Sequence, residues 1–383
     1  MPLLSARPKG IALTEKQKIA WLRLIRSDNV GPATFRDLIN QFGSAETALA
    51  VLPELSARGG GTRPIRVASE AEALRELEIA ERFGARFIGI GEPDYPHVLR
   101  AIHGAPPLLA IKGDPGVLRH PAVAIVGARN ASISGMKLAA MVAQHCGRSG
   151  YTIISGLARG IDTAAHRASL ATGTIAVIAG GLDRPYPPEN IPLLHEIWNG
   201  NGVAISEMPF GWEPRARDFP RRNRLIAGIG LGLVVVEAAT RSGSLISARL
   251  AGENGRLVFA VPGSPLDPRA GGTNLLLKDG AIIVTAPEDV TEALAPMAEP
   301  DLFRQTVAKE SEPTSRPISS LPDDSDRDRI VTALGTTPVE VDDIIRHTGL
   351  TASSVYLVLL ELDMAGRLHR HEGGLVSMSM GTD

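Results

Sequence analysis

The sequence contains a single cysteine, Cys146, among 383 residues. One thiol excludes an intramolecular disulfide framework and a cysteine-based zinc cluster, and it is typical of a reducing compartment. Aromatic residues are also scarce, at 4%, whereas glycines number 40, which indicates loops shaped by their backbone. No apolar run approaches the roughly 18 residues of a membrane span, and no signal peptide opens the chain. The composition predicts a soluble, cytoplasmic protein that does not engage a membrane.

The chain has almost no excess charge of either sign. It contains 40 lysines and arginines against 42 acidic residues, a net charge of −2. This balance excludes a general basic coat for nucleic acid, but it is compatible with a local basic patch. The length suffices for two or three domains with cores of their own.

Residues 10–78 are predicted to form a small helical domain. The segments "TEKQKIAWLRLIR", "GPATFRDLINQF" and "SAETALAVL" place apolar residues three and four apart. Thr14 and Ser44 are candidate N-caps, and Pro32 suits a first helical turn. The stretch "NVGPATFRDLI" resembles one hairpin of a helix-hairpin-helix or SAM-like module. Such a hairpin either packs within the protein or brings a helix N-terminus to a phosphate, and both alternatives stay open.

Residues 79–295 alternate short β-branched runs with amphipathic stretches. The strand candidates are "ARFIGIG", "PLLAIKG", "AVAIVGA", "YTIISG", "GTIAVIAGG", "GVAISEM", "GLVVVEAA" and "RLVFAVPG". Continuous apolar strands that alternate with helices predict an α/β domain. Its expected architecture is a Rossmann-like, doubly wound and mostly parallel sheet covered on both faces.

The last part of the chain changes character twice. Residues 296–325 are rich in proline, serine and charge, and they predict a flexible linker. Residues 326–380 predict three helices and a short hairpin, with Gly349 between the second and third helices, as in a winged helix. The third helix, "TASSVYLVLLELDMAG", offers no arginine or lysine before Arg367, which is poor for phosphate docking. This favours a module that contacts protein or tunes the oligomeric state over one that contacts DNA.

The loops after the predicted strands are the places to look for a ligand, because doubly wound sheets bind ligands at the carboxyl ends of their strands. In "VAIVGARNAS" a strand runs into Gly127, Arg129 and Asn130. No G-x-G-x-x-G comes after it, and no Walker A lysine loop occurs in the chain. The glycine turn, the N–H groups of the next helix and the arginine suit a phosphate. An ordinary turn with a solvated arginine explains the motif equally well.

A second loop, "IISGLARGIDTAAH", contains Ser155 and Gly156 and leads into a helix with Asp162 and His166. An aspartate near a histidine invites a catalytic interpretation, but no serine or cysteine stands in a nucleophile elbow. We therefore expect the aspartate both to cap the helix and to shape the loop, and the histidine to be half-buried. In a third loop, "GGLDRPYPPEN", an arginine and a tyrosine either face the cleft or serve ordinary loop chemistry.

The stretch "EPRARDFPRRNR" concentrates five arginines and two acidic residues in front of an apolar run. Arginine suits bidentate recognition of phosphate, and Phe219 offers a face on which an unpaired base can stack for about 1–3 kcal/mol. The alternatives are a solvated loop, or arginines paired with Glu207, Glu213 or Glu237. The predicted position at the same sheet edge as the two glycine loops favours binding.

A further loop, "VEAATRSGSLISARLAGE", opens a helix with Arg241, Ser242, Gly243 and Ser244. Small residues with free N–H groups at a helix start form an anion cradle. The segment "GGTNLLLKDGA" supplies another glycine-threonine turn before a helix.

Taken in order, "VAIVGARNAS", "SGLARGID", "GGLDRPYPPEN", "FPRRNRLIAGI", "RSGSLISARLA", "VFAVPG" and "GTNLLLKDGA" closely resemble the DNA-processing protein A (DprA/Smf) family across the whole central domain. The resemblance implies a Rossmann-like fold that needs no dinucleotide and a homodimer that binds single-stranded DNA. It also implies that the protein protects incoming DNA and loads RecA recombinase onto it in natural transformation. A recombination mediator of this kind is expected to have no catalytic residue, cofactor or metal.

The resemblance also implies a set of DNA-binding positions. The phosphate-binding arginine of the first loop falls on Arg129, and the basic position before Phe219 falls on either Arg215 or Arg217. The complete predicted site consists of Gly127, Arg129, Asn130, Ser155, Gly156, Arg217, Phe219, Arg222, Asn223, Arg224, Arg241, Ser242, Gly243 and Ser244.

The alternative function is a nucleotide-binding enzyme. The glycine loops also resemble those of the lysine-decarboxylase-like nucleoside-monophosphate hydrolases, whose P-G-G-x-G-T-x-x-E loop carries a catalytic glutamate. The segment "GGTNLLLKDG" lacks a glutamate at the matching spacing, which argues against hydrolysis. An NAD-linked oxidoreductase would need the dinucleotide fingerprint that the first loop lacks.

Overall fold

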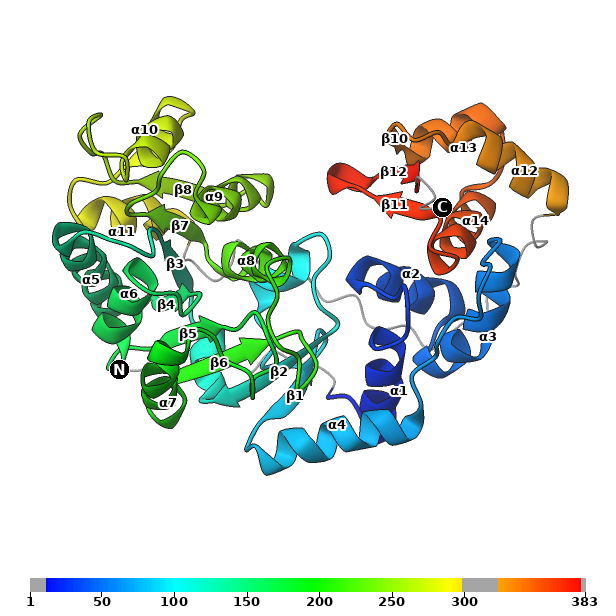
Figure 1. Cartoon of the computed structure of the whole chain (residues 1–383), viewed down its shortest axis with the longest axis horizontal. Coiled ribbons are helices and arrows are strands. Elements are labelled where there is room, and N and C mark those ends of the chain that lie inside the picture. The colour runs from blue at the N-terminus through cyan, green and yellow to red at the C-terminus, as the bar shows by residue number, and fades with distance from the viewer. Residues whose placement is uncertain (1–11, 298–322, 380–383) are drawn as a thin grey trace. The chain divides into compact units, whose positions relative to one another are not determined.

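The computed structural model describes residues 12–297 and 323–379, so most of the predicted linker lies outside the described residues. The described residues form two compact units (Figure 1). One contains residues 12–13 and 75–297, and the other contains residues 14–74 and 323–379. None of the described helices is long and apolar enough to cross a membrane.

The first unit is built on a nine-stranded sheet. Its strands are β1 (Arg86–Gly89), β2 (Leu108–Gly113), β3 (Ala122–Val126), β4 (Thr152–Ser155), β5 (Thr174–Val177), β6 (Gly202–Ser206), β7 (Gly232–Val235), β8 (Leu257–Ala260) and β9 (Ile282–Ile283). Their order is β1-β2-β6-β5-β4-β3-β7-β8-β9. The β1–β2 and β2–β6 pairs are antiparallel and the remaining pairs are parallel. The predicted doubly wound, mostly parallel sheet is therefore confirmed, with the short β9 as an addition.

Helices cover both faces of this sheet, as expected for a doubly wound fold. They are α5 (Ile133–Arg148), α6 (Ile161–Ser169), α7 (Ile191–Asn199), α8 (Asp218–Ile229), α9 (Gly243–Glu253), α10 (Gly271–Lys278) and α11 (Glu288–Leu294). Single 3-10 turns are η1 (His97–Ala101), η2 (Pro115–Arg119), η3 (Pro188–Asn190) and η4 (Ala295–Met297).

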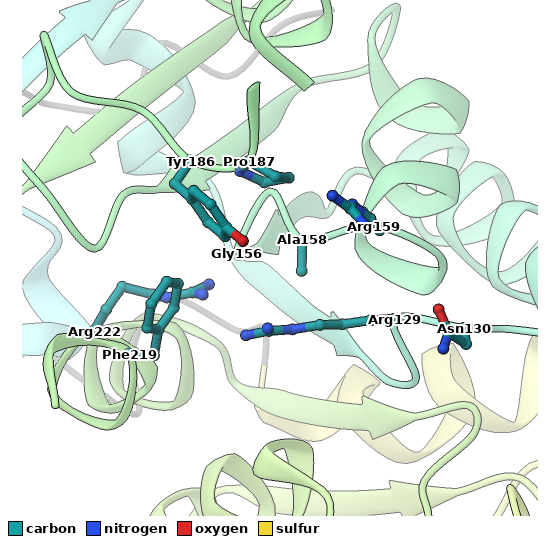
Figure 2. Close-up of a pocket in the computed structure, with 9 residues that line it drawn as sticks. All are labelled: Arg129, Asn130, Gly156, Ala158, Arg159, Tyr186, Pro187, Phe219 and Arg222. Carbon is teal, nitrogen blue, oxygen red and sulfur yellow. The ribbon is translucent and has the colours of Figure 1, made fainter. Parts of the chain in front are cut away.

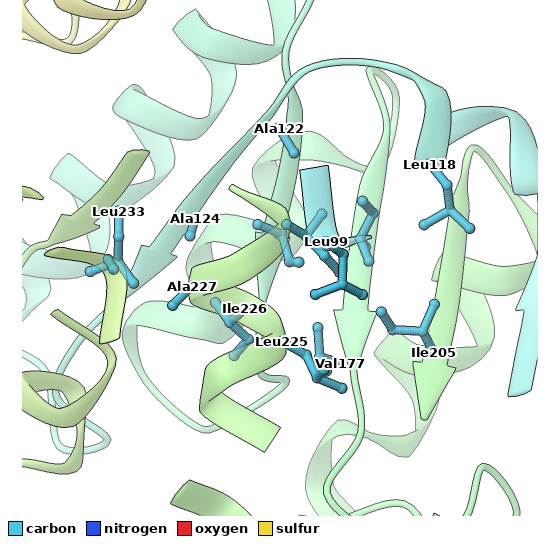
Figure 3. Packing of buried hydrophobic residues seen from close by; sticks show 14 of the residues in the cluster. Leu99, Leu118, Ala122, Ala124, Val177, Ile205, Leu225, Ile226, Ala227 and Leu233 are labelled. Atoms are coloured by element: carbon cyan, nitrogen blue, oxygen red, sulfur yellow. The ribbon is translucent and has the colours of Figure 1, made fainter. Parts of the chain in front are cut away.

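Strand β3 shows how one apolar run serves two cores. Val123 and Ile125 pack with α5, α6 and α11 on one face, whereas Ala122 and Ala124 pack with α8 and α9 on the other (Figure 3). Successive side chains of a strand point to opposite faces, so a strand covered on both sides has no polar alternation. This explains the continuous apolar runs of the sequence.

The chain reverses its direction of winding at β3. Strands β4, β5 and β6 are added on one side of β3, and the chain then crosses back through α8 to add β7, β8 and β9 on the other side. The carboxyl edge between β3 and β7 is therefore the topological switch point, where doubly wound sheets bind their ligands.

The N-terminal helices of the second unit are α1 (Glu15–Ile25), α2 (Pro32–Phe42), α3 (Ala45–Arg58) and the first part of α4 (Glu70–Arg82). Thr14 caps α1 in a capping box with Gln17, Ser44 caps α3, and Pro32 occupies the first turn of α2. These three sequence predictions are confirmed. The domain boundary that we predicted at residue 78 falls inside α4.

The same unit contains the C-terminal winged helix. Its elements are α12 (Asp324–Ala333), β10 (Val339–Glu340), α13 (Val341–Thr348), α14 (Ala352–Met364), β11 (Leu368–Arg370), η5 (Glu372–Gly374) and β12 (Leu375–Met378), with the strand order β10-β12-β11. Gly349 ends α13 in the left-handed conformation, with φ 67°. Helix α14 shares a core with α1, α2 and α3, a contact that the sequence analysis did not predict.

Candidate nucleic-acid interface

Helix α8 joins the basic stretch to the core of the first unit. Its second half is buried, with Leu225 and Ile226 packed beneath the sheet (Figure 3). Its first half carries Phe219, Arg222 and Asn223 beside the loops that come after β3 and β4. Because α8 comes after β6, its N-terminus lies at the carboxyl edge of the sheet. The apolar run therefore anchors the helix, and the arginines reach the switch point.

A cavity of about 180 Å³ lies at this edge (Figure 2). It is lined by Arg129, Asn130, Gly156, Ala158, Arg159, Tyr186, Pro187, Phe219 and Arg222. A second hollow of about 220 Å³ shares part of this lining and extends to residues 242–244 at the start of α9. Together the two hollows form one site along the loops after β3, β4 and β7, which we call the switch-point cleft.

Two aromatic rings and two guanidinium groups meet in the cleft. The rings of Tyr186 and Phe219 lie edge to face, with their centroids 5.9 Å apart. The guanidinium carbon atoms of Arg129 and Arg222 lie 5.4 Å and 5.8 Å from the centroid of the Phe219 ring. Figure 2 shows Arg129 extending from the first loop toward Phe219. The arrangement places two cations beside a stacking face.

Arg222 is the most deeply buried cation of the cleft, with 6% of its surface exposed. Burial lowers its pKa to about 10, although the charge of Asp162 counteracts this shift, so the guanidinium stays protonated at neutral pH. Its Nε atom has no hydrogen-bond partner among the described residues. The guanidinium lies against Gly156, where a Cβ atom would come within 1.3 Å of it. A buried charge without a hydrogen-bonding partner is costly to hold, which indicates an anionic ligand.

The second loop is shaped by Asp162, as one of the two predicted roles requires. Its carboxylate accepts the N–H groups of Gly156 at 3.0 Å and Ala158 at 3.2 Å. The other predicted role was wrong, because the N-cap of α6 is Gly160, with φ 73°. His166 is fully buried instead of half-buried. We attribute this to α6, which packs that side chain against the sheet.

Arg224 does not enter the cleft, contrary to its predicted position in the site. Its guanidinium donates to Glu207 and to the carbonyl of Gly104, and Arg221 donates to the same glutamate at 3.0 Å. Residues three apart share a helix face, so Arg221 and Arg224 turn together toward the end of β6. Arg222 points away from both. The alternative pairing with Glu207 thus holds for two arginines of this stretch.

The first loop differs from the expected anion cradle. The N-terminus of α5 is filled by the carboxylate of Glu237, which accepts the N–H of Ser132 at 2.9 Å and the hydroxyl of the same serine. A Cβ atom at Gly135 would lie 2.5 Å from this carboxylate. The positive end of the helix dipole is therefore already neutralised. The loop contributes Arg129 to the cleft, not free N–H groups of α5.

The fourth part of the cleft is the start of α9. The Ser242 hydroxyl caps the helix by accepting the N–H of Ser244. Asn223 of α8 donates to the carbonyl of Gly243 at 3.4 Å. This contact fixes α8 beside α9, so the predicted small-residue cradle and the basic stretch lie at one edge.

A family model described as DNA recombination-mediator protein A matches residues 86–295, more than half of the chain. The chain belongs to this family. Two further family models, described as a DprA-like N-terminal HHH domain and a DprA winged helix domain, match residues 15–79 and 312–374. The family assignment and the expected helix-hairpin-helix and winged-helix domains are confirmed.

Several relatives share these domains. Protein Smf from Escherichia coli K12 is 36% identical over 292 residues, which cover 74% of this chain and 75% of that protein. A putative DNA processing protein DprA from Mycobacterium tuberculosis H37Rv is 33% identical, and the match covers 92% of each chain. The DNA processing protein DprA from Streptococcus pneumoniae R6 is 47% identical over 198 residues, which cover 51% of this chain and 70% of that one.

Two solved structures of the family resemble this chain. The X-ray structure of DprA from Streptococcus pneumoniae aligns with a TM-score of 0.62 at 35% identity, covering 74% of this chain and 98% of the other. A structure of DNA processing protein A from Helicobacter pylori, described for its single-stranded DNA binding mode, aligns with a TM-score of 0.51 at 27% identity. That alignment covers 56% of this chain and 97% of the other.

Most positions of the predicted site line the cleft: Gly127, Arg129, Asn130, Gly156, Phe219, Arg222, Asn223, Ser242, Gly243 and Ser244. Four do not. The Ser155 hydroxyl is buried and donates to the carbonyl of Ile125 at 2.6 Å, and Arg224 is paired with Glu207. Arg217 and Arg241 are exposed and lie outside the linings of both hollows.

Among the lining side chains that the predicted site omitted, Arg159, Tyr186 and Pro187 are found in the first hollow. Tyr186 was considered as one of two open alternatives for the third loop, and it faces the cleft. Arg184 of the same loop instead pairs with Asp183 and Glu213. The signal for Arg159 was present in the "LARGID" motif, since an arginine there comes just after the carboxyl end of β4.

Proposed function

We propose that the chain binds single-stranded DNA in the switch-point cleft. The observation that carries this proposal is Arg222, a buried and protonated guanidinium without an ion pair among the described residues, held beside the ring of Phe219. Arginine forms bidentate hydrogen bonds with phosphate. Phosphate oxygens therefore suit this guanidinium better than a neutral ligand does.

The lining of the cleft suits a strand whose bases are unpaired. Tyr186, with 46% of its surface exposed, stands beside Phe219, and base stacking on such rings contributes about 1–3 kcal/mol per base. Arg129 extends along the same wall and suits a neighbouring phosphate. In a duplex the base faces are already stacked, so this combination of charge and rings favours single strands.

The family supports the same assignment. One of its structures, from Helicobacter pylori, is described for a single-stranded DNA binding mode, and the family is described as a recombination mediator. We therefore propose that this chain acts as a homodimer that binds incoming single strands and loads a RecA recombinase onto them, without a chemical step of its own. The recombinase role is tested by measuring how fast RecA filaments nucleate on single strands coated with single-strand-binding protein. We expect nucleation to be faster with this protein than without it. The dimer is testable by analytical ultracentrifugation.

The first experiment is fluorescence anisotropy of a labelled poly-dT oligonucleotide titrated with the protein, with duplex DNA as competitor. We expect tight binding that the duplex competes for weakly. Arg129 is exposed and forms no ion pair with the described residues, so the substitution Arg129→Ala should leave the fold intact. It should weaken binding about tenfold to a hundredfold, since a hydrogen bond to a charged group contributes about 1.5–3 kcal/mol.

Arg221→Ala is the matched control, because it removes the same charge from the same region but from the side paired with Glu207. Its affinity should stay within about twofold of the parent, because this guanidinium is held by the buried Glu207 outside the cleft. Equal losses in the two variants would mean that DNA does not use the cleft.

The hydrolase alternative has a direct test of its own. Nucleoside monophosphates are incubated with the protein, and release of the free base is measured by chromatography. We expect none above a protein-free blank. Base release that Arg222→Lys abolishes would replace the DNA-binding proposal with an enzymatic one.

A further inference from the structure

Helix α14 of the winged helix belongs to two hydrophobic cores. One stripe of its side chains packs inside the winged helix: Val355, Val358, Leu359 and Leu362. A second stripe packs among α1, α2 and α3: Leu357, Leu360 and Met364. A helix with apolar residues on several sides must be buried on each of them. The second stripe therefore marks a surface that the helical domain covers.

A buried carboxylate lies at the centre of this contact. Glu361 is 1% exposed, and Arg327 of α12 holds it in a bidentate pair with hydrogen bonds of 2.8 Å and 3.1 Å. Arg58 of α3 approaches the same carboxylate at 3.9 Å. The bidentate pair holds α14 to α12 within the winged helix, and Arg58 adds a longer charge contact from α3 to the same carboxylate.

The C-terminal end of α14 engages the hairpin between α1 and α2. Thr34 donates to the carboxylate of Asp363 at 2.8 Å, and Asn29 donates to the carbonyl of Met364 at 3.0 Å. Arg370 bridges the two domains, since it pairs with Asp363 at 2.7 Å and with Asp37 of α2 at 2.8 Å. The sequence of this hairpin, "NVGPATFRDLI", left open whether it packs within the protein or approaches a phosphate. In the structure it packs against the winged helix.

Gly59, at the end of α3, lies where the helical domain and the winged helix approach each other closely enough to exclude a side chain. A Cβ atom there would lie 1.9 Å from the carbonyl oxygen of Glu361 and 2.9 Å from the Cβ of Ala365. The glycine has φ −70°, a conformation open to any residue, so the helix itself does not require it. Its carbonyl also accepts a hydrogen bond from Arg367 at 3.0 Å. The close approach of the docked α14 therefore leaves no room for a side chain at this position.

The charge of the winged helix disfavours DNA as the partner of α14. Residues 323–379 contain five arginines and ten acidic residues, a net charge of −5. All five arginines have partners within the unit. In winged helices and related readers the recognition helix enters the major groove, and proteins that bind duplexes present cations to the phosphates.

We propose that α14 is a docking helix whose partner is the N-terminal helical domain of the same chain. The winged helix then acts as an intramolecular clamp on α1, α2 and α3, and it covers their hairpin instead of reading duplex DNA. This inference is independent of the switch-point cleft.

A steric wedge tests the docking in the full chain. In Gly59→Leu the new side chain meets the backbone of α14, whereas Gly335→Leu, within the winged helix, has only one atom nearby, at 3.9 Å. Hydrogen exchange is measured by mass spectrometry for peptides from α14 and α2. We expect exchange at least about tenfold faster in Gly59→Leu, and within about twofold of the parent in the control. Unchanged exchange in the wedge variant would overturn the docking.

A double-mutant cycle covers the case in which the wedge unfolds the helical domain. Thr34→Ala and Asp363→Asn are made singly and together, and their effects on the exchange rates are compared. If the two side chains meet in solution, the double variant exchanges more slowly than the product of the single effects predicts. Effects that simply multiply would contradict the contact.

Duplex DNA is the competing partner, and it supplies the last test. Binding of a short labelled duplex is measured for the parent and for Gly59→Leu at the same salt concentration. We expect equal affinities. Binding about tenfold tighter in the wedge variant would show that undocking releases a DNA-reading helix, and it would overturn the claim that the winged helix does not read duplex DNA.

Discussion

Arg222 and Arg224 are two positions apart in α8 and have opposite roles. Arg222 faces the cleft beside Gly156, whereas Arg224 is held by Glu207. The sequence predicted that arginines gather at this sheet edge, because the basic stretch comes after a strand. It did not predict which of them are paired, since the pairing depends on how α8 is rotated against the end of β6.

The contact between Gly156 and Arg222 predicts the effect of one methyl group. In Gly156→Ala the new Cβ would lie 1.3 Å from a guanidinium nitrogen of Arg222. The flexible Arg222 side chain must therefore move away from its position in the cleft. We expect single-stranded DNA affinity to fall at least about tenfold, with a loss of unfolding free energy of about 1 kcal/mol, the central value for single substitutions. Anisotropy and urea denaturation measure the two quantities.

Gly252→Ala is the control for this substitution. Gly252 lies on α9 outside the linings of both hollows, and its Cβ would have no neighbour within 4 Å. Its affinity should stay close to that of the parent. A similar loss in both variants would point to backbone flexibility and not to the position of Arg222.

His166 predicts a pH dependence of stability. It is buried beneath the second loop, its Nδ1 atom lies 2.7 Å from the Thr174 hydroxyl, and burial lowers its pKa to about 3. Because the unfolded chain binds a proton near pH 6.5 and the folded chain does not, the neutral ring's contribution is complete above that pH. It is lost as the pH falls toward 3.

Urea denaturation at several pH values measures this effect. Relative to His166→Gln, the parent should lose up to about 1.4 kcal/mol per pH unit below about pH 6. The exposed His120 provides the control, since the curve of His120→Gln should match that of the parent. Parallel curves for the parent and His166→Gln would show that the ring is protonated in the folded state.

At the scale of elements, the sequence predicted the features that local pattern determines. The strands β1 to β8, the caps of α1 and α3, and the glycine turn between α13 and α14 arise from β-branched runs, Ser/Thr caps and glycine. The two-residue β9 was not predicted, because so short a strand has no periodicity to detect. The docking of α14 on α3 was also missed, since a second apolar stripe does not identify its partner.

The filled N-terminus of α5 gives the element-scale prediction. Glu237→Gln keeps the shape of the side chain but removes the charge that the helix dipole and two Ser132 donors stabilise. We expect a loss of about 1–2 kcal/mol of unfolding free energy, measured by urea denaturation. Single-stranded DNA affinity should not change, because Glu237 lines neither hollow of the cleft.

The control at this scale is Glu253→Gln. Glu253 belongs to an exposed pair on α9, so its loss should cost less than about 0.5 kcal/mol. A DNA-binding defect in Glu237→Gln would mean that α5 takes part in the site after all.

At the scale of the molecule, charge is distributed unevenly around a total of −2. The winged helix is acidic, while the guanidinium groups of Arg129 and Arg222 gather in the switch-point cleft. The near-neutral total argues against a general basic coat. The local concentration of positive charge could be predicted from the sequence only in part, because the cleft gathers residues from several loops between β3 and α9.

This distribution predicts how salt affects binding. If phosphates meet cations only in the cleft, each lost contact lowers the slope of log K against log salt by about 0.7 for single strands. Anisotropy titrations at several salt concentrations should therefore give Arg129→Ala a slope about 0.7 smaller than that of the parent. Arg221→Ala should keep the parent slope, because its guanidinium is paired with Glu207 outside the cleft. Equal decreases of the slope in both variants would mean that DNA responds to the general electric field of the protein surface. The phosphates would then not be bound specifically in the cleft.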